Sequence, residues 1–223
     1  MVRVVLEDNM KLMARYPDGY FDLAIVDPPY GVLNKTARGG DKKFNKSEYS
    51  KWDVKPGEDY FDELFRVSKN QIVWGGNYFG NLWARSQYNR GFVIWDKNQP
   101  ESLNNFSMAE MAWTSFDMPS KIFHFSVRKN RNKIHPTQKP VELYEWLLKM
   151  YAKQGDRVLD THLGSGTIAV ACCKLGVELT ACEVSEEYFN KSKGLLMEYV
   201  SDYVLEDGEG EYRVSNGKEF ETR

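Results

Sequence analysis

The chain has 223 residues, a formal net charge of −2 and a hydrophobic content of 42%, as ordinary globular proteins do. This length predicts one domain, or one domain with an insertion. No apolar run of about 18 residues and no secretory leader is recognisable, so we expect a cytoplasmic protein without a membrane partner. The three cysteines form no C-x-x-C pair and the three histidines lie far apart, so neither a disulfide framework nor a metal site is expected.

In the first part of the chain, short apolar runs alternate with helical patterns. Strands are expected at 2–7, 21–26 and 71–75, and helices at 9–15 and 59–67. Residues 31–51, rich in Lys, Gly and Asn, predict a loop.

The strand at 21–26 leads directly into Asp27-Pro28-Pro29-Tyr30. Each proline fixes its own φ, removes an N–H and keeps the preceding residue extended. The motif therefore presents a carboxylate, a free carbonyl group and an aromatic ring at a strand end, where open α/β sheets bind ligands. These groups suit a flat heterocycle that carries an amino group. A simple Pro-Pro turn with a surface tyrosine is the plainer interpretation of the motif alone.

The second part of the chain continues the alternation. Strands are expected at 92–95, 108–116, 121–125, 157–160 and 178–184, and helices at 140–151, 168–175 and 186–200. Residues 205–223 predict either a hairpin or a frayed tail. The whole pattern indicates an α/β fold.

Between the strand at 157–160 and the helix at 168–175 lies the turn Gly164-Ser165-Gly166-Thr167. Glycines allow a tight turn and the close approach of a ligand. Glu183, on the following strand, stands where an acid accepts hydrogen bonds from ribose hydroxyls. Neither G-x-G-x-x-G nor a P-loop lysine is present, so the site suits a nucleoside without phosphates, of which S-adenosylmethionine is the common example.

Three motifs together resemble the amino-methyltransferases of DNA that many bacteriophages and restriction–modification systems carry. They are Asp27-Pro28-Pro29-Tyr30-Gly31, His135-Pro136-Thr137-Gln138-Lys139-Pro140, and Asp160-x-x-x-Gly164-Ser165-Gly166-Thr167. The catalytic motif precedes the cofactor motif, which is the permuted order of the family's beta group. The resemblance covers about four-fifths of the chain.

The resemblance implies a Rossmann-like methyltransferase sheet with a permuted motif order and a small target-recognition insertion. On this basis we divide one methyltransferase domain, 1–223, into four parts. These are a catalytic half (1–80), the target-recognition insertion (81–133), a cofactor-binding half (134–205) and a C-terminal tail (206–223).

The resemblance also implies the site residues and the reaction. Asp27, Pro28, Pro29 and Tyr30 are the expected catalytic residues, for methyl transfer from S-adenosyl-L-methionine to N6 of a flipped adenine in double-stranded DNA. The expected cofactor-binding residues are Asp8, Thr137, Gln138, Lys139, Asp160, His162, Gly164, Ser165, Gly166, Thr167 and Glu183. Among them, Lys139 is expected either to meet the methionine carboxylate or to be a solvated residue at a helix start. The family often has Pro-Phe where this chain has Thr161-His162, so we expect His162 to lie over the cofactor as a flat ring.

The charge distribution agrees with a DNA partner. Residues 31–51 hold six Lys/Arg and two acids, residues 118–140 hold six Lys/Arg and no acid, and residues 183–223 hold eleven acids and five Lys/Arg. Contact with phosphates requires a basic stripe and not a basic total. Solvated loops are the alternative interpretation. A homodimer is a further expectation, since some members of the group form one.

Several alternatives remain at this stage. N4-cytosine methylation uses the same chemistry, although Ser is usual there at the position of Asp27. RNA and protein-glutamine methyltransferases usually have Asn before Pro-Pro-Tyr and place the cofactor motif first. A non-catalytic DNA-binding module is less consistent with the presence of Asp27, Tyr30 and Glu183. A nicotinamide dehydrogenase is disfavoured by the absence of G-x-G-x-x-G.

Overall fold

The computed structural model describes residues 1–32, 53–86, 89–99, 107–129, 133–208, 210–215 and 218–222. The loop expected at 31–51 lies almost entirely outside the described residues and stays a prediction.

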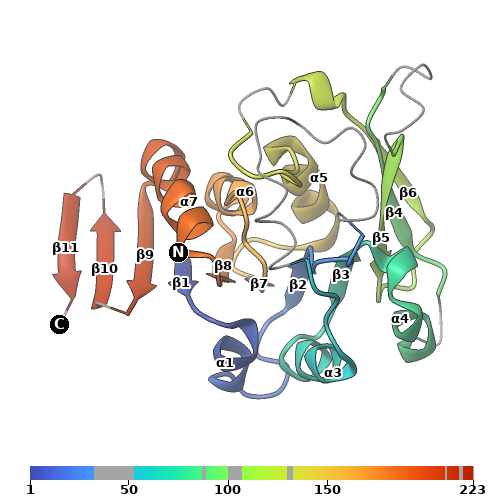
Figure 1. Cartoon of the computed structure of the whole chain (residues 1–223), viewed down its shortest axis with the longest axis horizontal. Helices are drawn as coiled ribbons and strands as arrows, with labels where there is room; N and C mark the ends of the chain where they lie inside the picture. The colour runs from blue at the N-terminus through green and yellow to red at the C-terminus, as the bar shows by residue number, and fades with distance from the viewer. Residues whose placement is uncertain are drawn as a thin grey trace.

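One mixed sheet runs through the described part of the chain (Figure 1). Its strands are β1 (Val2–Leu6), β2 (Leu23–Val26), β3 (Gln71–Trp74), β4 (Phe92–Asp96), β5 (Ala109–Thr114), β6 (Lys121–His124), β7 (Arg157–Asp160), β8 (Glu178–Glu183), β9 (Asp202–Asp207), β10 (Gly210–Ser215) and β11 (Lys218–Thr222). The order across the sheet is β11-β10-β9-β1-β8-β7-β2-β3-β5-β4-β6. The run from β9 to β3 is parallel, whereas β5 and β10 pair antiparallel with their neighbours.

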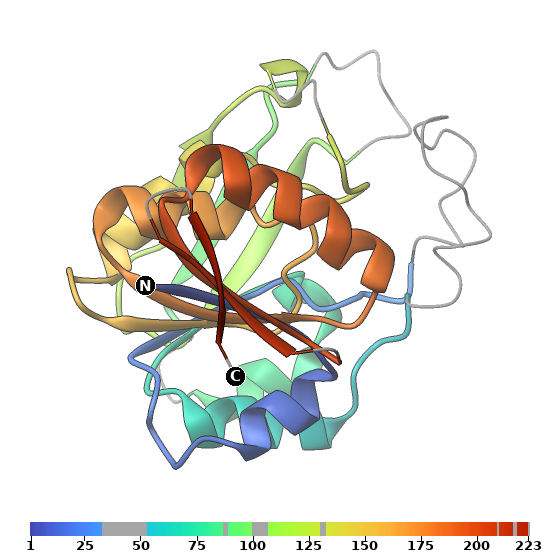
Figure 2. The same cartoon turned by 90° about the vertical axis from the view of Figure 1, so that its left-hand side faces the viewer.

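Helices cover both faces of this sheet (Figures 1 and 2). On one face lie α1 (Asn9–Ala14), α3 (Glu58–Val67) and α4 (Gly80–Arg85); on the other lie α5 (Val141–Tyr151), α6 (Thr167–Leu175) and α7 (Glu186–Tyr199). Two short 3₁₀ turns, η1 (Gly76–Tyr78) and η2 (Val127–Lys129), follow β3 and β6.

The central strands are apolar on both sides because each side meets a layer of helices. Side chains alternate between the two faces of a strand. In β2, Leu23 and Ile25 belong to the core under α5 and α6, while Ala24 and Val26 belong to the core under α1 and α3. This explains why the run reads as continuously hydrophobic in the sequence.

The predicted α/β fold is confirmed, with differences at the edges. Helix α4 was not predicted, since it has six residues and begins at Gly80, a poor helix former. Strand β2 begins at Leu23 and not at Phe21, which forms only an isolated bridge with Ser68.

Of the two expectations for 205–223, the hairpin is confirmed and the frayed tail is wrong, because the segment belongs to the sheet. Strand β9 pairs in parallel with β1, and β10 and β11 follow as a hairpin. The expected boundary at residue 206 therefore falls inside β9. Tyr203, Val204 and Leu205 are buried there, because the edge of β1 offers both hydrogen bonds and an apolar surface. Residues 81–133 likewise contribute β4, β5 and β6 to the same sheet, and their role in target recognition stays a prediction.

Within the described ranges, no helix is both long enough and apolar enough to cross a membrane.

Candidate active site

A cavity of about 1170 Å³ opens at the carboxyl ends of the parallel strands. Strand β2 lies between β7 and β3 in the sheet, so the turn after β7 and the turn after β2 meet at this edge although they are far apart in sequence. Twelve of the predicted site residues line the cavity: Asp8, Asp27, Pro28, Pro29, Tyr30, Thr137, Gln138, Lys139, His162, Gly164, Ser165 and Glu183. Asp160, Gly166 and Thr167 do not line it.

Asp27 stands at the end of β2, and both of its carboxylate oxygens accept hydrogen bonds. The Tyr30 hydroxyl donates to Oδ1 and the Lys139 ammonium donates to Oδ2. Each oxygen of a carboxylate has two lone pairs, so further N–H donors can still bind. The two hydrogen bonds hold the carboxylate in place. The side chain is 16% exposed, so it remains accessible from the cavity.

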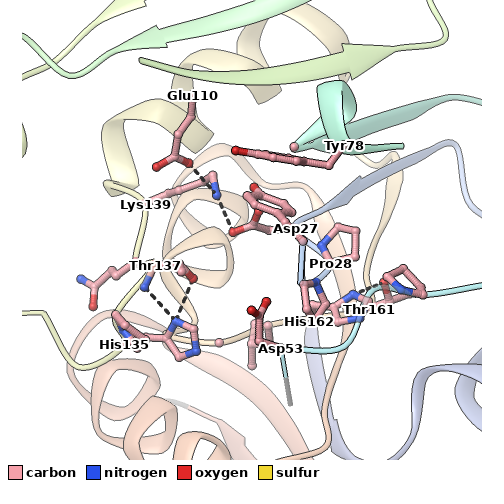
Figure 3. Close-up of a pocket in the computed structure, with 18 of the residues that line it drawn as sticks. Asp27, Pro28, Asp53, Tyr78, Glu110, His135, Thr137, Lys139, Thr161 and His162 are labelled. Carbon is pink, nitrogen blue, oxygen red and sulfur yellow. Dashed lines mark hydrogen bonds and ion pairs between the residues drawn. The ribbon is translucent and has the colours of Figure 1, made fainter. Parts of the chain in front are cut away.

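Lys139 is not the solvated residue that one alternative expected, and its contact with a methionine carboxylate stays a prediction. Its side chain is 1% exposed, and its ammonium lies between Asp27 and Glu110 Oε2, the latter at 3.3 Å (Figure 3). The ammonium also lies over the Trp74 ring, 4.9 Å from the centroid. Burial opposes the charge, but Asp27 and Glu110 outweigh it and raise the pKa of Lys139.

Glu110 is a site residue that we did not predict from sequence. Burial raises its pKa, but the charges of Lys139 and Lys97 outweigh this and lower the pKa to about 2. Its contact with Lys97 Nζ is 2.6 Å. The signal in the sequence was a single acid inside the apolar strand segment Ala109–Thr114.

The Tyr30 ring stacks on Tyr78, with centroids 5.0 Å apart and planes at 16°. Gly75 makes room for this pair: its φ is +69°, and a Cβ there would lie 2.1 Å from Tyr30 Cε1. Tyr78 comes from η1, after the carboxyl end of β3. Two aromatic rings thus wall the cavity beside Asp27, and Tyr78 was absent from the predicted site.

The other side of the cavity is formed by the Gly-rich turn. Gly164 and Gly166 have φ of +56° and +80°, values that suit glycine. Glu183 fixes the turn, since its Oε2 accepts from Gly164 N at 2.8 Å and its Oε1 accepts from Ser185 N at 2.9 Å. Burial raises the pKa of Glu183, although these backbone donors oppose the shift.

Asp160 lies beneath the turn and not on the cavity wall. It is 2% exposed and accepts a hydrogen bond from His162 N at 3.0 Å. Burial raises its pKa to about 7. Gly166 forms the N-cap of α6 and Thr167 Oγ1 lies 3.3 Å from Ser165 Oγ, so all three residues shape the turn. Their direct contact with a cofactor stays a prediction.

His162 is fixed by its neighbours at the cavity. Its Nε2 lies 3.1 Å from Asn9 Nδ2 and its Nδ1 lies 2.9 Å from Thr161 Oγ1, which in turn bonds to the Tyr60 hydroxyl at 2.7 Å. Burial lowers the pKa of His162 to about 4, so the ring is neutral at pH 7. Asp8 acts as the N-cap of α1 while lining the same wall.

The segment before α5 also lines the cavity, next to the Gly-rich turn: a Cβ on Gly164 would lie 3.5 Å from the His135 ring. Thr137 Oγ1 lies 3.1 Å from His135 Nδ1, and the His135 ring packs edge-on against Tyr188 at 4.3 Å. Gln138 accepts from Ile134 N at 2.9 Å and so holds its own loop. Burial lowers the pKa of His135 to about 3, again leaving a neutral ring.

The comparisons with known proteins agree with this fold. The family described as DNA methylase, N6_N4_Mtase, matches residues 73–194, more than half of the chain. Type II methyltransferase M.HpaI of Haemophilus parainfluenzae is 26% identical over 234 residues, which cover 86% of this chain and 73% of that protein.

Two solved structures show the same fold. TTHA0409 of Thermus thermophilus, complexed with S-adenosyl-L-methionine, has a TM-score of 0.61 at 18% identity, and the match covers 93% of this chain and 99% of that one. The PvuII DNA methyltransferase, described as cytosine-N4-specific, has a TM-score of 0.59 at 14% identity, and the match covers 85% of this chain and 84% of that one.

The fold is that of a Rossmann-like methyltransferase, with the Asp-Pro-Pro-Tyr turn and the Gly-rich turn at one cavity on the carboxyl edge of the sheet. The chain belongs to the N6/N4 DNA methylase family.

Proposed function

We propose that the chain methylates N6 of adenine in double-stranded DNA, with S-adenosyl-L-methionine as the methyl donor. The observation that carries the proposal is the position of Asp27. It lies at the end of β2, between the Gly-rich turn on one side and the Tyr30–Tyr78 stack on the other.

The Gly-rich turn suits a cofactor that carries no phosphate. Gly164 keeps the turn close to the cavity, and no Lys or Arg occurs between Asp160 and Thr167. Glu183 retains free lone pairs beyond its two backbone donors and lines the cavity, so it is suited to ribose hydroxyls. Asp8, His162, Ser165 and Thr137 line the remaining walls of this side.

S-adenosylmethionine supplies an electrophilic sulfonium methyl group. The amino nitrogen of adenine is a weak nucleophile because its lone pair is delocalised into the ring. Asp27 and the Pro28 carbonyl accept hydrogen bonds from the two N–H groups, which favours a pyramidal nitrogen with an available lone pair. The carboxylate then stabilises the positive charge that develops on nitrogen, so most of the rate comes from positioning and electrostatics.

The target base must leave the duplex to reach Asp27. Tyr78 stacks on one face of the Tyr30 ring, and Tyr30 would stack on the flipped base through its other face. N4-cytosine methylation is the second candidate, since the PvuII enzyme shares the fold. An aspartate at position 27, where serine is usual in that group, favours adenine.

The test is methylation of DNA that carries no prior methylation, with labelled S-adenosyl-L-methionine, followed by nucleoside mass spectrometry. We expect N6-methyladenine. N4-methylcytosine as the product would replace the adenine assignment, and absence of transfer to DNA would remove the proposal. Sequencing with base-modification detection then identifies the methylated site.

A further inference from the structure

The charged groups around Asp27 include two that the proposed reaction does not use. Lys139 and Glu110 are contributed by different elements, the first before α5 and the second on β5, and they meet next to the catalytic carboxylate (Figure 3). Lys97 completes the cluster from the end of β4, through its contact with Glu110.

The position of Lys139 is unfavourable for folding alone. Its side chain is almost completely buried, and an isolated buried ammonium is very costly. It also lies immediately before Pro140, the N-cap of α5, where the helix dipole disfavours a positive charge. The carboxylates of Asp27 and Glu110, with the face of Trp74, offset this cost. A buried lysine at so unfavourable a position, in contact with the catalytic acid, indicates a role in the reaction.

We propose that Lys139 and Glu110 are positioning residues: Lys139 holds the Asp27 carboxylate in the orientation that receives the amino group, and Glu110 holds Lys139. The inference rests on the proposed function and changes one predicted role, since Lys139 serves the target base side of the cavity and does not bind the methionine carboxylate.

The contacts support a sequence in which Glu110 positions Lys139 and Lys139 positions Asp27. Tyr30 donates to one oxygen of Asp27 and Lys139 to the other, so rotation of the carboxylate about its Cβ–Cγ bond would break both hydrogen bonds. Glu110 reaches the catalytic acid through the Lys139 ammonium, which lies 3.3 Å from Glu110 Oε2. Among the described residues, Lys139 and Asp160 interact electrostatically with Asp27, as do the phenols Tyr30, Tyr60 and Tyr144.

The test uses the full chain and the DNA site found by modification sequencing. Lys139→Met keeps an unbranched side chain, shorter by one heavy atom, and removes the charge. We expect kcat to fall by about 10²-fold or more, as for the loss of a preorganised electrostatic group, while the calorimetric Kd for S-adenosyl-L-methionine stays within about twofold. A matched control is Lys193→Met, which removes an ion-paired lysine from α7 outside the cavity and should leave kcat unchanged.

A double variant distinguishes positioning from a merely structural role. Glu110→Gln should lower kcat by about tenfold, but Lys139→Met/Glu110→Gln should be no slower than Lys139→Met, because Glu110 acts through Lys139. The double variant should also melt at a higher temperature than Lys139→Met, because it no longer buries the Glu110 charge without the Lys139 ammonium. If Lys139→Met does not fold, Glu110→Gln alone tests the inference. We then expect Glu110→Gln to have a lower kcat than the wild type and a cofactor Kd within about twofold of the wild-type value.

Three results would overturn the inference. These are a Lys139→Met variant with weakened cofactor binding and normal kcat, a double variant that loses activity additively, and cofactor Kd values that change in parallel with kcat. If instead the wild-type chain transfers no methyl group to DNA, the proposed function itself fails, and the two failures are therefore distinguishable.

Discussion

At the scale of single residues, the hydrogen bonds to the two carboxylate oxygens of Asp27 fix the group that we propose accepts the amino N–H of the base. Tyr30 and Lys139 hold these oxygens in place, and Asp27 lines the cavity beside the stacked rings of Tyr30 and Tyr78. Little reorganisation is needed when the amino group arrives, which is the property that makes such acceptors effective.

Replacing Asp27 should separate catalysis from cofactor binding. Asp27→Asn keeps the shape of the side chain but removes its charge, so we expect kcat to fall by about 10²–10³-fold. The affinity for S-adenosyl-L-methionine should stay nearly unchanged, because the carboxylate acts on the amino group. Single-turnover methylation and calorimetry measure the two quantities. Full turnover in this variant would show that Asp27 does not act on the amino group.

Tyr30 should show two separable contributions. Tyr30→Ala should weaken capture of the flipped base by roughly 1–3 kcal/mol of stacking. Tyr30→Phe keeps the π-face but loses the hydroxyl that donates to Asp27, so capture should be normal and kcat lower by about tenfold, the equivalent of one hydrogen bond. Fluorescence of 2-aminopurine at the target position reports capture. The assignment fails if Phe and Ala weaken capture equally.

At the scale of elements, the turn between β7 and α6 is stabilised from below by a buried acid. Asp160 accepts the His162 N–H and does not reach the cavity. Burial raises its pKa to about 7, well above its ordinary value. The folded state therefore holds a proton on this carboxyl group more strongly than the unfolded state does.

This shift predicts a particular pH dependence of stability. Because the folded pKa is the higher one, the contribution of Asp160 to stability is present below the unfolded pKa of about 3.9 and is lost as pH rises toward 7. Asp160→Asn keeps an acceptor for His162 N–H and cannot ionise. Urea unfolding at pH 5 and pH 8 should show that the wild type loses more free energy of unfolding than the variant over this interval. Parallel changes in the two proteins would contradict the buried, protonated state.

At the scale of the whole molecule, charge is distributed unevenly along one sheet. The segment with eleven acids, 183–223, runs from the end of β8 through α7 into β9, β10 and β11, and these three strands lie at the end of the sheet opposite β4 to β6. Of the basic residues expected to meet phosphates, Arg128 and Lys129 lie in η2, near the cavity wall that includes Val127. Lys42, Lys43, Lys46 and Arg131 lie outside the described residues.

The salt dependence of DNA binding tests this distribution. If Arg128 or Lys129 contacts a phosphate, its replacement by Ala should lower the slope of log K against log salt by about one unit and weaken all sequences nearly equally. Lys153→Ala, at an exposed lysine after α5, is the control and should leave the slope unchanged. An unchanged slope for both Arg128→Ala and Lys129→Ala would identify η2 as a solvated segment.

The local sequence was sufficient to predict most helices and strands. It was also sufficient to place the Asp-Pro-Pro-Tyr turn and the Gly-rich turn. The apolar runs of β2 and β7 are buried on both faces, and glycine or proline follows each, so their ends could be recognised without tertiary information. Asp27, Tyr30, Gly164 and Glu183 line the cavity because they lie at or just after strand ends, and the strand ends follow from hydrophobic periodicity.

Only the tertiary structure decided what these residues touch. Lys139 and Asp27 are 112 positions apart, and no local pattern indicates that they share a hydrogen bond. Glu110 and Tyr78 enter the site because β3, β5 and β4 are neighbours in the sheet, and strand order depends on packing over the whole chain. For Asp160, the place in the motif predicted a residue on the cavity wall. The tertiary structure buries it instead. Sequence periodicity determines which face of a strand is buried; long-range packing determines which side chains meet at its end, and that is where the chemistry of this protein is set.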